Sequence, residues 1–246
     1  YAGSNDEPTR AWLTSLDDND AFVKHTPLLA TDMVSFRIEG DGATEIVAIS
    51  DIGELLLFTD AGVWTARGDQ DGVLRPDTIN LQPVTYDGAA RGSVATMYDT
   101  IVYVERQNSI PREIRFDVGQ GGYNGFASRD LTVFAPGLFD GYIIVEWAFV
   151  RAPNSLLYAL RNDGVLLCLT YLRDQDIWAW SRHDTGGDSV QSIWAMPEDG
   201  YDALWMIVAR TVDGNVERYI ERVQERVGAL SVSADDWWYL DSALRF

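Results

Sequence analysis

Residues 155–184 read SLLYALRNDGVLLCLTYLRDQDIWAWSRHD and contain three apolar runs separated by two polar turns. The first run, Leu156–Leu160, leads into Asn162–Gly164, whose residue types tolerate the positive φ angles of tight hairpin turns. The second run, Val165–Leu172, is longer, and after a charged turn the chain resumes as Ile177–Ser181. The stretch therefore predicts three successive strands. Because the central run is apolar on both faces, its sheet must be covered on both sides, so we expect similar sheets to stack against it.

The same order of apolar run, turn and second run recurs at 54–67, 100–116 and 203–223. The apolar runs open 46, 55 and 48 residues apart, at Leu55, Ile101, Leu156 and Leu204. Each unit is preceded by a strand-like run, at Glu45–Ser50, Ser93–Tyr98, Tyr142–Val150 and Val190–Met196. Each unit also includes a candidate fourth strand, at Asn80–Thr85, Asp130–Phe134, Ile177–Ser181 and Asp236–Leu240.

Four strands per unit at a period of about 40 to 50 residues are typical of β-propeller blades. We therefore predict an all-β, β-propeller-like fold of stacked four-stranded antiparallel blades, with at least four recognisable units. We expect one propeller domain over 1–246, with an irregular lead-in at 1–40 and the four units at 41–246. Within the lead-in, Tyr1–Thr31 is polar, and Met33–Ile38 alternates like the last strand of a blade shared with another segment. Since the chain starts without Met and ends in a strand-like run, we expect it to be a portion of a longer protein.

The composition narrows the classes of function. The 246 residues carry 38 acidic and 19 basic side chains, a net charge of −19, which argues against a surface that grips nucleic acid. No apolar run approaches the roughly 18 to 20 residues of a membrane-spanning helix. One cysteine, Cys168, excludes an internal disulfide and is expected to be buried. The predicted core residues lie near the strand centres, at Leu56, Val102, Leu157, Leu167 and Trp205.

Several stretches invite a chemical interpretation, and each also has a structural one. Asp17–Asp20 gathers carboxylates, but it lacks the full calcium-loop pattern and also suits a solvated loop. Arg115–Gly125 is glycine-rich, but no helix follows it to cradle a phosphate, and an ordinary loop between blades explains it. Thr59–Trp64 is similar to the Asp-box turns of sialidases, which are themselves structural. His25 and His183 are the only histidines, so a catalytic triad would need one of them.

We predict no catalytic residue, no cofactor-binding residue and no metal ligand, and hence a protein that is not an enzyme. Two alternatives stay open at this point. A propeller glycosidase or lyase would need a convergent pair of carboxylates, and a glycan-binding protein would need an exposed aromatic platform, for which Trp237 and Trp238 are the candidates.

One segment has two possible conformations. Its apolar residues fall at i, i+3, i+4, i+7, i+11 and i+14, the spacing of an amphipathic helix, at Val216, Tyr219, Ile220, Val223, Val227 and Leu230. The repeat instead makes Val216–Val223 a strand, because Asp213-Gly214 before it corresponds to Asp163-Gly164 in the third unit. We predict a strand.

The chain resembles the tail nozzle proteins of short-tailed bacteriophages, a family also called tail tubular protein B or phage stabilisation protein. The segments that carry the resemblance occur in order over about residues 45–246. They are LLLFTDAGVWTARGD (55–69), IVYVERQNSIPREIRFD (101–117), RDLTVFAPGLFDG (129–141), LLYALRNDGVLLCLTYLRDQDIWAWSRHDTGG (156–187), ALWMIVARTVDGNVERYIERV (203–223) and YLDSALRF (239–246).

The resemblance implies a structural protein of the virion, located in the phage tail, with no catalytic residues. It implies identical subunits in a hexameric ring, next to adaptor and portal-proximal proteins, with tail fibres or spikes as further candidate partners. Genomic DNA would pass through the ring during ejection without specific binding. Members of the family are usually longer, so this chain would correspond to the propeller portion.

Overall fold

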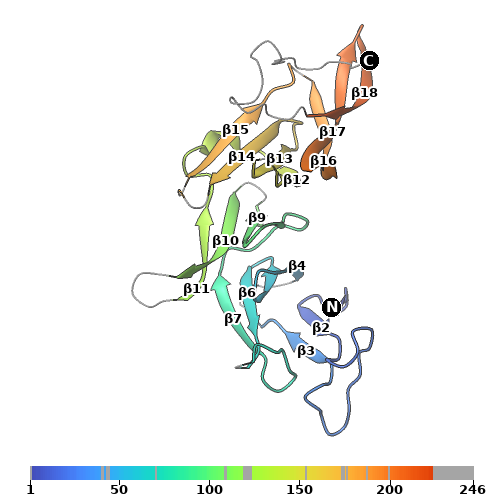
Figure 1. Cartoon of the computed structure of the whole chain (residues 1–246), viewed down its shortest axis with the longest axis vertical. Helices are drawn as coiled ribbons and strands as arrows, with labels where there is room; N and C mark the ends of the chain where they lie inside the picture. The colour runs from blue at the N-terminus through green and yellow to red at the C-terminus, as the bar shows by residue number, and fades with distance from the viewer. Residues whose placement is uncertain are drawn as a thin grey trace. The chain divides into compact units, whose positions relative to one another are not determined.

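The computed structural model of the chain consists of β-strands and connecting loops (Figure 1). Among the residues it describes there is one short 3₁₀ turn, η1 (Pro136–Leu138), and no α-helix. The chain divides into two compact units, Tyr1–Val133 and Phe134–Phe246, which are described separately below. The described residues are 2–39, 42, 45–69, 71–107, 110–118, 124–152, 154–172, 175, 177–186, 188–198 and 200–223.

The first unit contains three antiparallel sheets in its described part. The N-terminal sheet has the order β1-β2-β3, from β1 (Ala2–Gly3), β2 (Arg10–Leu13) and β3 (Val34–Arg37). The next has the order β4-β5-β6-β7, from β4 (Ile46–Asp51), β5 (Leu55–Thr59), β6 (Gly62–Arg67) and β7 (Asn80–Thr85). The third has the order β11-β10-β9-β8, from β8 (Ala95–Met97), β9 (Thr100–Val104), β10 (Pro111–Val118) and β11 (Asn124–Asp130).

The second unit contains two antiparallel sheets in its described part. One has the order β12-β13-β14-β15, from β12 (Ile144–Val150), β13 (Leu156–Arg161), β14 (Leu166–Leu172) and β15 (Ile177–His183). The other has the order β16-β17-β18, from β16 (Ser189–Glu198), β17 (Tyr201–Val212) and β18 (Asn215–Arg222). The predicted all-β architecture of four-stranded antiparallel, blade-like sheets is therefore confirmed. That these sheets belong to one propeller domain stays a prediction.

Most predicted strands lie where they were expected, and β18 confirms the strand over the helix for Asn215–Arg222. Residues 224–230 of the same apolar pattern, and the predicted strand Asp236–Leu240, lie outside the described residues.

Three sequence predictions are wrong. The lead-in is not irregular throughout, because β2 pairs with β1 and with β3, so β3 has its sheet partners within the lead-in. The fourth strand of the second repeat is β11 (Asn124–Asp130) and not Asp130–Phe134, so the stretch Arg115–Gly125, expected as a loop between blades, contributes residues to both strands of a β-hairpin. Trp205 is partly exposed instead of belonging to the core. The other predicted core residues are fully buried, namely Leu56, Val102, Leu157 and Leu167.

The same hydrogen bonds recur in the repeats. After the second strand of the first repeat, the Asp60 N–H donates to the Glu45 carbonyl, and Asp60 Oδ1 accepts the Glu45 N–H at 3.2 Å. After the second strand of the third repeat, Asn162 and Ile143 make the same pair of bonds, with 3.1 Å from the Ile143 N–H to Asn162 Oδ1. A residue with a short oxygen-bearing side chain therefore fastens the end of the second strand to the start of the first.

A register shift marks the start of the first strand in the first, third and fourth repeats. It lies between Ile46 and Ala48 in β4, between Ile144 and Glu146 in β12, and between Val190 and Ser192 in β16. Such bulges bend a strand and increase its twist. Their recurrence at corresponding positions indicates that the repeats share a backbone plan as well as a sequence pattern.

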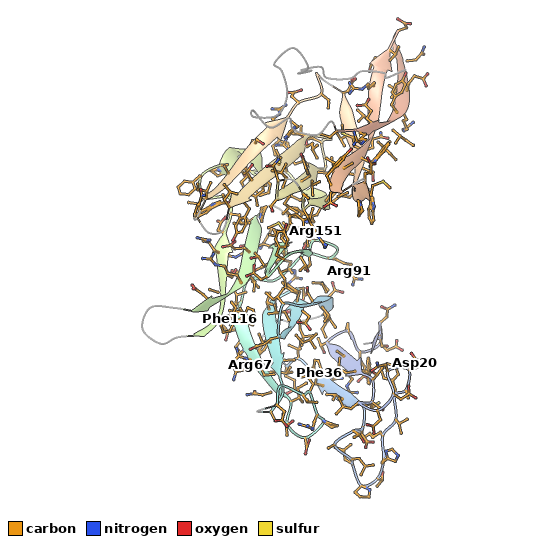
Figure 2. All side chains as sticks on the ribbon, viewed as in Figure 1. Asp20, Phe36, Arg67, Arg91, Phe116 and Arg151 are labelled. Carbon is orange, nitrogen blue, oxygen red and sulfur yellow. The ribbon has the colours of Figure 1, made fainter. Side chains whose placement is uncertain are left out.

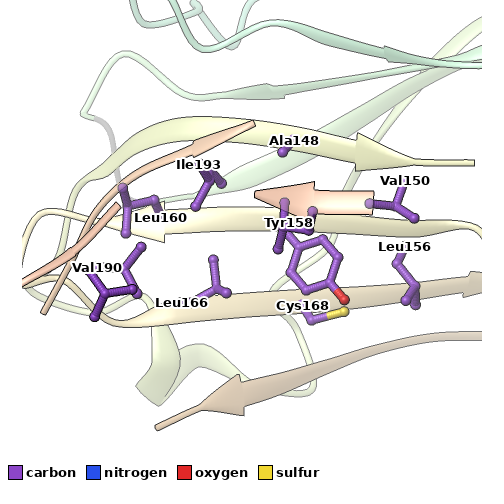
Figure 3. Packing of buried hydrophobic residues seen from close by; sticks show 11 residues of the cluster. Ala148, Val150, Leu156, Tyr158, Leu160, Leu166, Cys168, Val190 and Ile193 are labelled. Atoms are coloured by element: carbon purple, nitrogen blue, oxygen red, sulfur yellow. The ribbon is translucent and has the colours of Figure 1, made fainter. Parts of the chain in front are cut away.

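Apolar side chains hold the sheets together within each unit. In the first unit, one cluster joins the N-terminal sheet to β4–β7 and includes Phe36 and Leu57, and another joins β4–β7 to β8–β11 and includes Phe58 and Tyr103. The Phe58 and Tyr103 rings meet edge to face at 5.4 Å. In the second unit, Leu160 of β13 and Ile193 of β16 belong to the cluster between the two sheets (Figure 3). Sheets apolar on both faces are therefore stacked, as the sequence predicts.

Candidate functional site

His25 lies in the long loop between β2 and β3, where it contacts Asp32. Its Nδ1 is 2.5 Å from Asp32 Oδ1, while Asp32 Oδ2 accepts the backbone N–H groups of His25 and Leu29, both at 2.9 Å. Burial acts to raise the pKa of the Asp32 carboxyl, but these hydrogen bonds outweigh it and lower the pKa from 3.8 to about 2. The pair contains the same two residue types as the His–Asp part of a catalytic triad. Here, however, the Asp32 carboxylate binds backbone N–H groups and so holds the conformation of its own loop.

His183 and Cys168 lie in the second unit and take part in packing. The His183 ring meets the edge of Tyr158, with 5.8 Å between ring centroids. Cys168 is fully buried in the cluster between the two sheets (Figure 3), as the sequence predicts for a structural cysteine.

The Asp-box-like stretch is a hairpin turn between β5 and β6. Thr59 Oγ1 donates to the Gly62 carbonyl at 2.7 Å, and the Thr59 carbonyl accepts the Ala89 N–H at 2.8 Å. Asp60 is buried and holds the start of β4 by the bonds given above. The turn therefore serves the fold, in agreement with its structural interpretation.

The acidic and glycine-rich stretches give no built ligand site in the described part of the chain. Asp20 lies on the outside of its loop (Figure 2), and its N–H is bonded to Asp18 Oδ1 at 2.9 Å. The glycine-rich stretch falls in the hairpin of β10 and β11, with 119–123 outside the described residues. No group of three or more His, Cys, Asp or Glu side chains suited to a metal occurs among the described residues. Trp237 and Trp238 also lie outside them.

The sequence interpretation missed an exposed apolar surface on the sheet β16-β17-β18. One face of this sheet packs in the cluster of Figure 3 through Ile193, Leu204 and Val208. Side chains alternate between the faces of a strand, and directly paired residues share a face. The opposite face, called the outer face here, therefore carries the pairs Trp194–Trp205, Met196–Ala203 and Ile207–Ile220.

Large side chains of the outer face are exposed to solvent. Trp194 is 69% exposed and Ile220 is 75% exposed, with Met196 and Ile207 also exposed. Single exposed apolar residues are ordinary, but a contiguous group of them marks an interaction surface. The run Ile193–Met196 is apolar at every position, so no alternation in the sequence signals which face of this strand is exposed.

A polar network borders the outer face. Glu198 accepts hydrogen bonds from Trp205 Nε1 at 2.6 Å and from Arg222 Nε at 2.8 Å. Arg222 also bonds the Tyr201 hydroxyl, and its guanidinium lies 5.4 Å from the Tyr201 ring centroid. An apolar centre with a polar, aromatic rim is the usual anatomy of a protein–protein interface.

Comparison with known proteins does not identify the chain. No protein-family model matches the sequence, and no curated protein matches it significantly. The part of the chain described here contains no helix long and apolar enough to cross a membrane.

Proposed function

We propose that the chain is a structural subunit of the tail nozzle of a short-tailed bacteriophage, located in the virion and without enzymatic activity. In this role it assembles with identical copies into a ring, meets adaptor and portal-proximal proteins, and lines a channel through which DNA passes. The proposal starts from the resemblance described above, whose segments between residues 55 and 223 lie within the part of the chain that carries β4–β18.

The outer face of β16-β17-β18 is the observation that supports an assembly role best. Within each unit, neighbouring sheets bury apolar faces against one another. The outer face of β16-β17-β18 instead leaves Trp194 and Ile220 exposed to water. Burial of apolar area is worth about 25 cal/mol per Å², so a second protein surface is favoured there. An outer face used for assembly agrees with a subunit whose task is to build a larger structure.

The oligomeric state of the full chain tests this proposal. We expect light scattering and negative-stain electron microscopy to find ring-shaped oligomers. The double substitution Trp194→Ser with Ile220→Ser should dissociate them. Tyr86→Ser is the matched control, because Tyr86 is 78% exposed but lies in the first unit. A chain that stays monomeric at every concentration, or a control that dissociates equally, would contradict the proposal.

The alternative function, a glycan-binding or glycan-cleaving propeller, is favoured by a different observation. Phe134 is 78% exposed and its ring lies 5.6 Å from that of Trp178, so two aromatic rings adjoin at the surface of the second unit. Glycan-array binding that Trp178→Ala abolishes would support glycan binding. Release of reducing sugar, abolished by a single Asp or Glu substitution, would support glycan cleavage.

A further inference from the structure

The loop between β2 and β3, residues 14–33, presents a group of exposed apolar side chains (Figure 1). Each residue of 22–30 is exposed, and the large apolar side chains of the loop are 43 to 47% exposed. They are Leu16, Phe22, Val23, Leu28 and Leu29. A single exposed apolar residue is ordinary, whereas several on one loop indicate an interaction surface.

Hydrogen bonds fasten this loop to its own base. The Val23 carbonyl accepts the Met33 N–H at 2.9 Å. Asp32, which is buried, accepts the backbone N–H groups of His25 and Leu29, both at 2.9 Å. A surface that is already ordered loses less conformational entropy on binding. The loop is therefore preorganised for docking.

The exposed part of the loop is acidic. Asp17, Asp18 and Asp20 are exposed, whereas the loop carries one lysine, Lys24. Asp20 lies on the outside of the loop (Figure 2). A surface that binds this loop should therefore be apolar and should carry positive charge.

The outer face of β16-β17-β18 has these two properties. Arg218 lies opposite Ala209 and Arg222 opposite Trp205, so both arginines belong to the outer face with its exposed apolar residues. The Arg222 guanidinium binds Glu198. Arg218 Nε instead donates to the uncharged side chain of Gln191 at 2.8 Å, so this hydrogen bond leaves the positive charge of Arg218 unbalanced.

Charge determines which of these surfaces can meet between two copies of the chain. With a net charge of −19, two copies repel each other over most of their surfaces. A contact between two loops would gather three aspartates from each copy, and a contact between two outer faces would gather arginines from both. Like charges at an interface are unfavourable, whereas a loop against an outer face brings opposite charges together.

We propose that the 14–33 loop of one copy docks on the outer face of β16-β17-β18 of a second copy. Because the two surfaces differ, the contact is heterologous, and repeating it builds a ring where the rotation closes. Each copy then offers its loop to one neighbour and its outer face to the other. The inference rests on the proposed function and deepens it, since it assigns the contact between subunits of the ring.

Mixing two assembly-defective variants tests the heterologous contact. The loop variant carries Phe22→Ser with Leu28→Ser, and the face variant carries Trp194→Ser with Ile220→Ser. We expect each variant alone to be monomeric, because every contact would then contain one altered surface. An equimolar mixture should form dimers with one copy of each variant and nothing larger, because the intact loop and the intact face can meet only once.

Analytical ultracentrifugation measures these masses, and far-ultraviolet circular dichroism checks that both variants keep their β-structure. The mixture is followed up to about a hundredfold above the concentration at which the unsubstituted chain assembles, because a dimer lacks the avidity of a closed ring. Tyr86→Ser, which lies in neither surface, should assemble like the unsubstituted chain.

Each other outcome has a distinct meaning. A loop variant that still assembles alone would overturn this inference and leave the nozzle proposal standing. A mixture that stays monomeric would show that the loop and the outer face do not bind each other between copies. An unsubstituted chain that is monomeric would contradict the nozzle proposal and this inference with it.

Charge reversal tests the same contact without removing an apolar side chain. Asp20→Arg and Arg218→Asp should each weaken assembly about fivefold, because an exposed attraction is replaced by a repulsion of similar size. The chain that carries both substitutions should recover to within about twofold of the unsubstituted chain, since opposite charges face each other again. Asp77→Arg, at an exposed aspartate outside the loop, is the matched control and should leave assembly unchanged. Absence of recovery, or equal weakening by the control, would overturn the proposed contact.

Discussion

Leu167 and Leu172 are two leucines of the same strand, β14, that differ in burial. Leu167 is 0% exposed and Leu172 is 44% exposed. Leu167→Ala should lower the free energy of unfolding by about 2 to 5 kcal/mol, because it removes buried methyl groups and leaves a cavity. Leu172→Ala, the matched control, should cost within about 0.5 kcal/mol. Denaturant titration measures both, and equal costs would contradict the burial assigned to Leu167.

Asp32 predicts an acid-sensitive loop at the N-terminal end of the chain. Its pKa is lowered to about 2 in the folded state and returns to 3.8 on unfolding, so the carboxylate stabilises the fold above about pH 3.8. That stabilisation is lost as the pH falls from 3.8 towards 2. The expected result is a fall in unfolding free energy over this window that is smaller in Asp32→Asn. An identical pH dependence in the two proteins, measured by denaturant titration at each pH, would contradict the role of Asp32.

At the residue scale, the sequence predicts burial well and the face of a strand poorly. Leu56, Val102, Leu157 and Leu167 are buried as expected. Trp205 lies at the middle of its strand but on the outer face, since Leu204 beside it turns into the packed cluster. A strand apolar on both sides lacks the alternation that would tell the faces apart. For the same reason the outer face, the candidate site of assembly, was not predictable from composition.

At the element scale, the turn at Gly164 fastens the third repeat to the fourth. Gly164 has φ +83° and its carbonyl accepts the Val190 N–H at 3.0 Å. A Cβ at this position would lie 2.1 Å from Ser189 Oγ. Glycine is therefore favoured at this position for two reasons: the backbone has a positive φ angle, and no space is left for a Cβ atom beside Ser189.

Gly164→Ala should destabilise the protein more than Gly214→Ala, its matched control. Gly214 occupies the corresponding hairpin turn with φ +80°, but a Cβ there meets nothing within 4 Å. The shared left-handed backbone should cost about 1 to 2 kcal/mol in each variant. The clash with Ser189 should add about 1 to 3 kcal/mol to Gly164→Ala alone. Thermal unfolding measures the difference, and equal melting temperatures would contradict the contact between the turn and β16.

The elements that sequence predicts best are those bounded by clear turn residues. β5, β6, β13 and β14 flank Asp-Ala-Gly or Asn-Asp-Gly turns and begin within a residue or two of their expected positions. β11 was missed because its sequence, NGFASRD, has the glycine, asparagine and serine typical of a loop, while the apolar residues that follow it belong to no strand. β2 was missed because four residues between polar loops give too short a pattern. In both cases pairing with a neighbouring strand outweighs local propensity.

At the scale of the whole molecule, ion pairing determines what the surface charge can do. The chain has 38 acidic and 19 basic residues, and many described arginines already hold carboxylates. Arg210 pairs with Glu221 at 2.5 Å and Asp188 at 3.0 Å, and Arg112 pairs with Asp87 at 3.0 Å and Glu105 at 2.9 Å. A guanidinium engaged in this way is less available to a phosphate, so Arg210 and Arg112 do little to offset the acidic excess.

This excess predicts how a nozzle built from the chain would treat DNA. A basic lining would bind phosphates more tightly with each ion pair and would slow the passage of the duplex. An acidic lining repels the duplex over a distance near the Debye length, about 8 Å at physiological salt. We therefore expect the lumen-facing edge of the assembled ring to be net negative, and the chain not to retain duplex DNA at about 50 mM salt, where electrostatic binding is strong. Fluorescence anisotropy with a labelled duplex measures retention. Micromolar binding, or a lumen lined chiefly by arginine in a structure of the ring, would contradict this prediction.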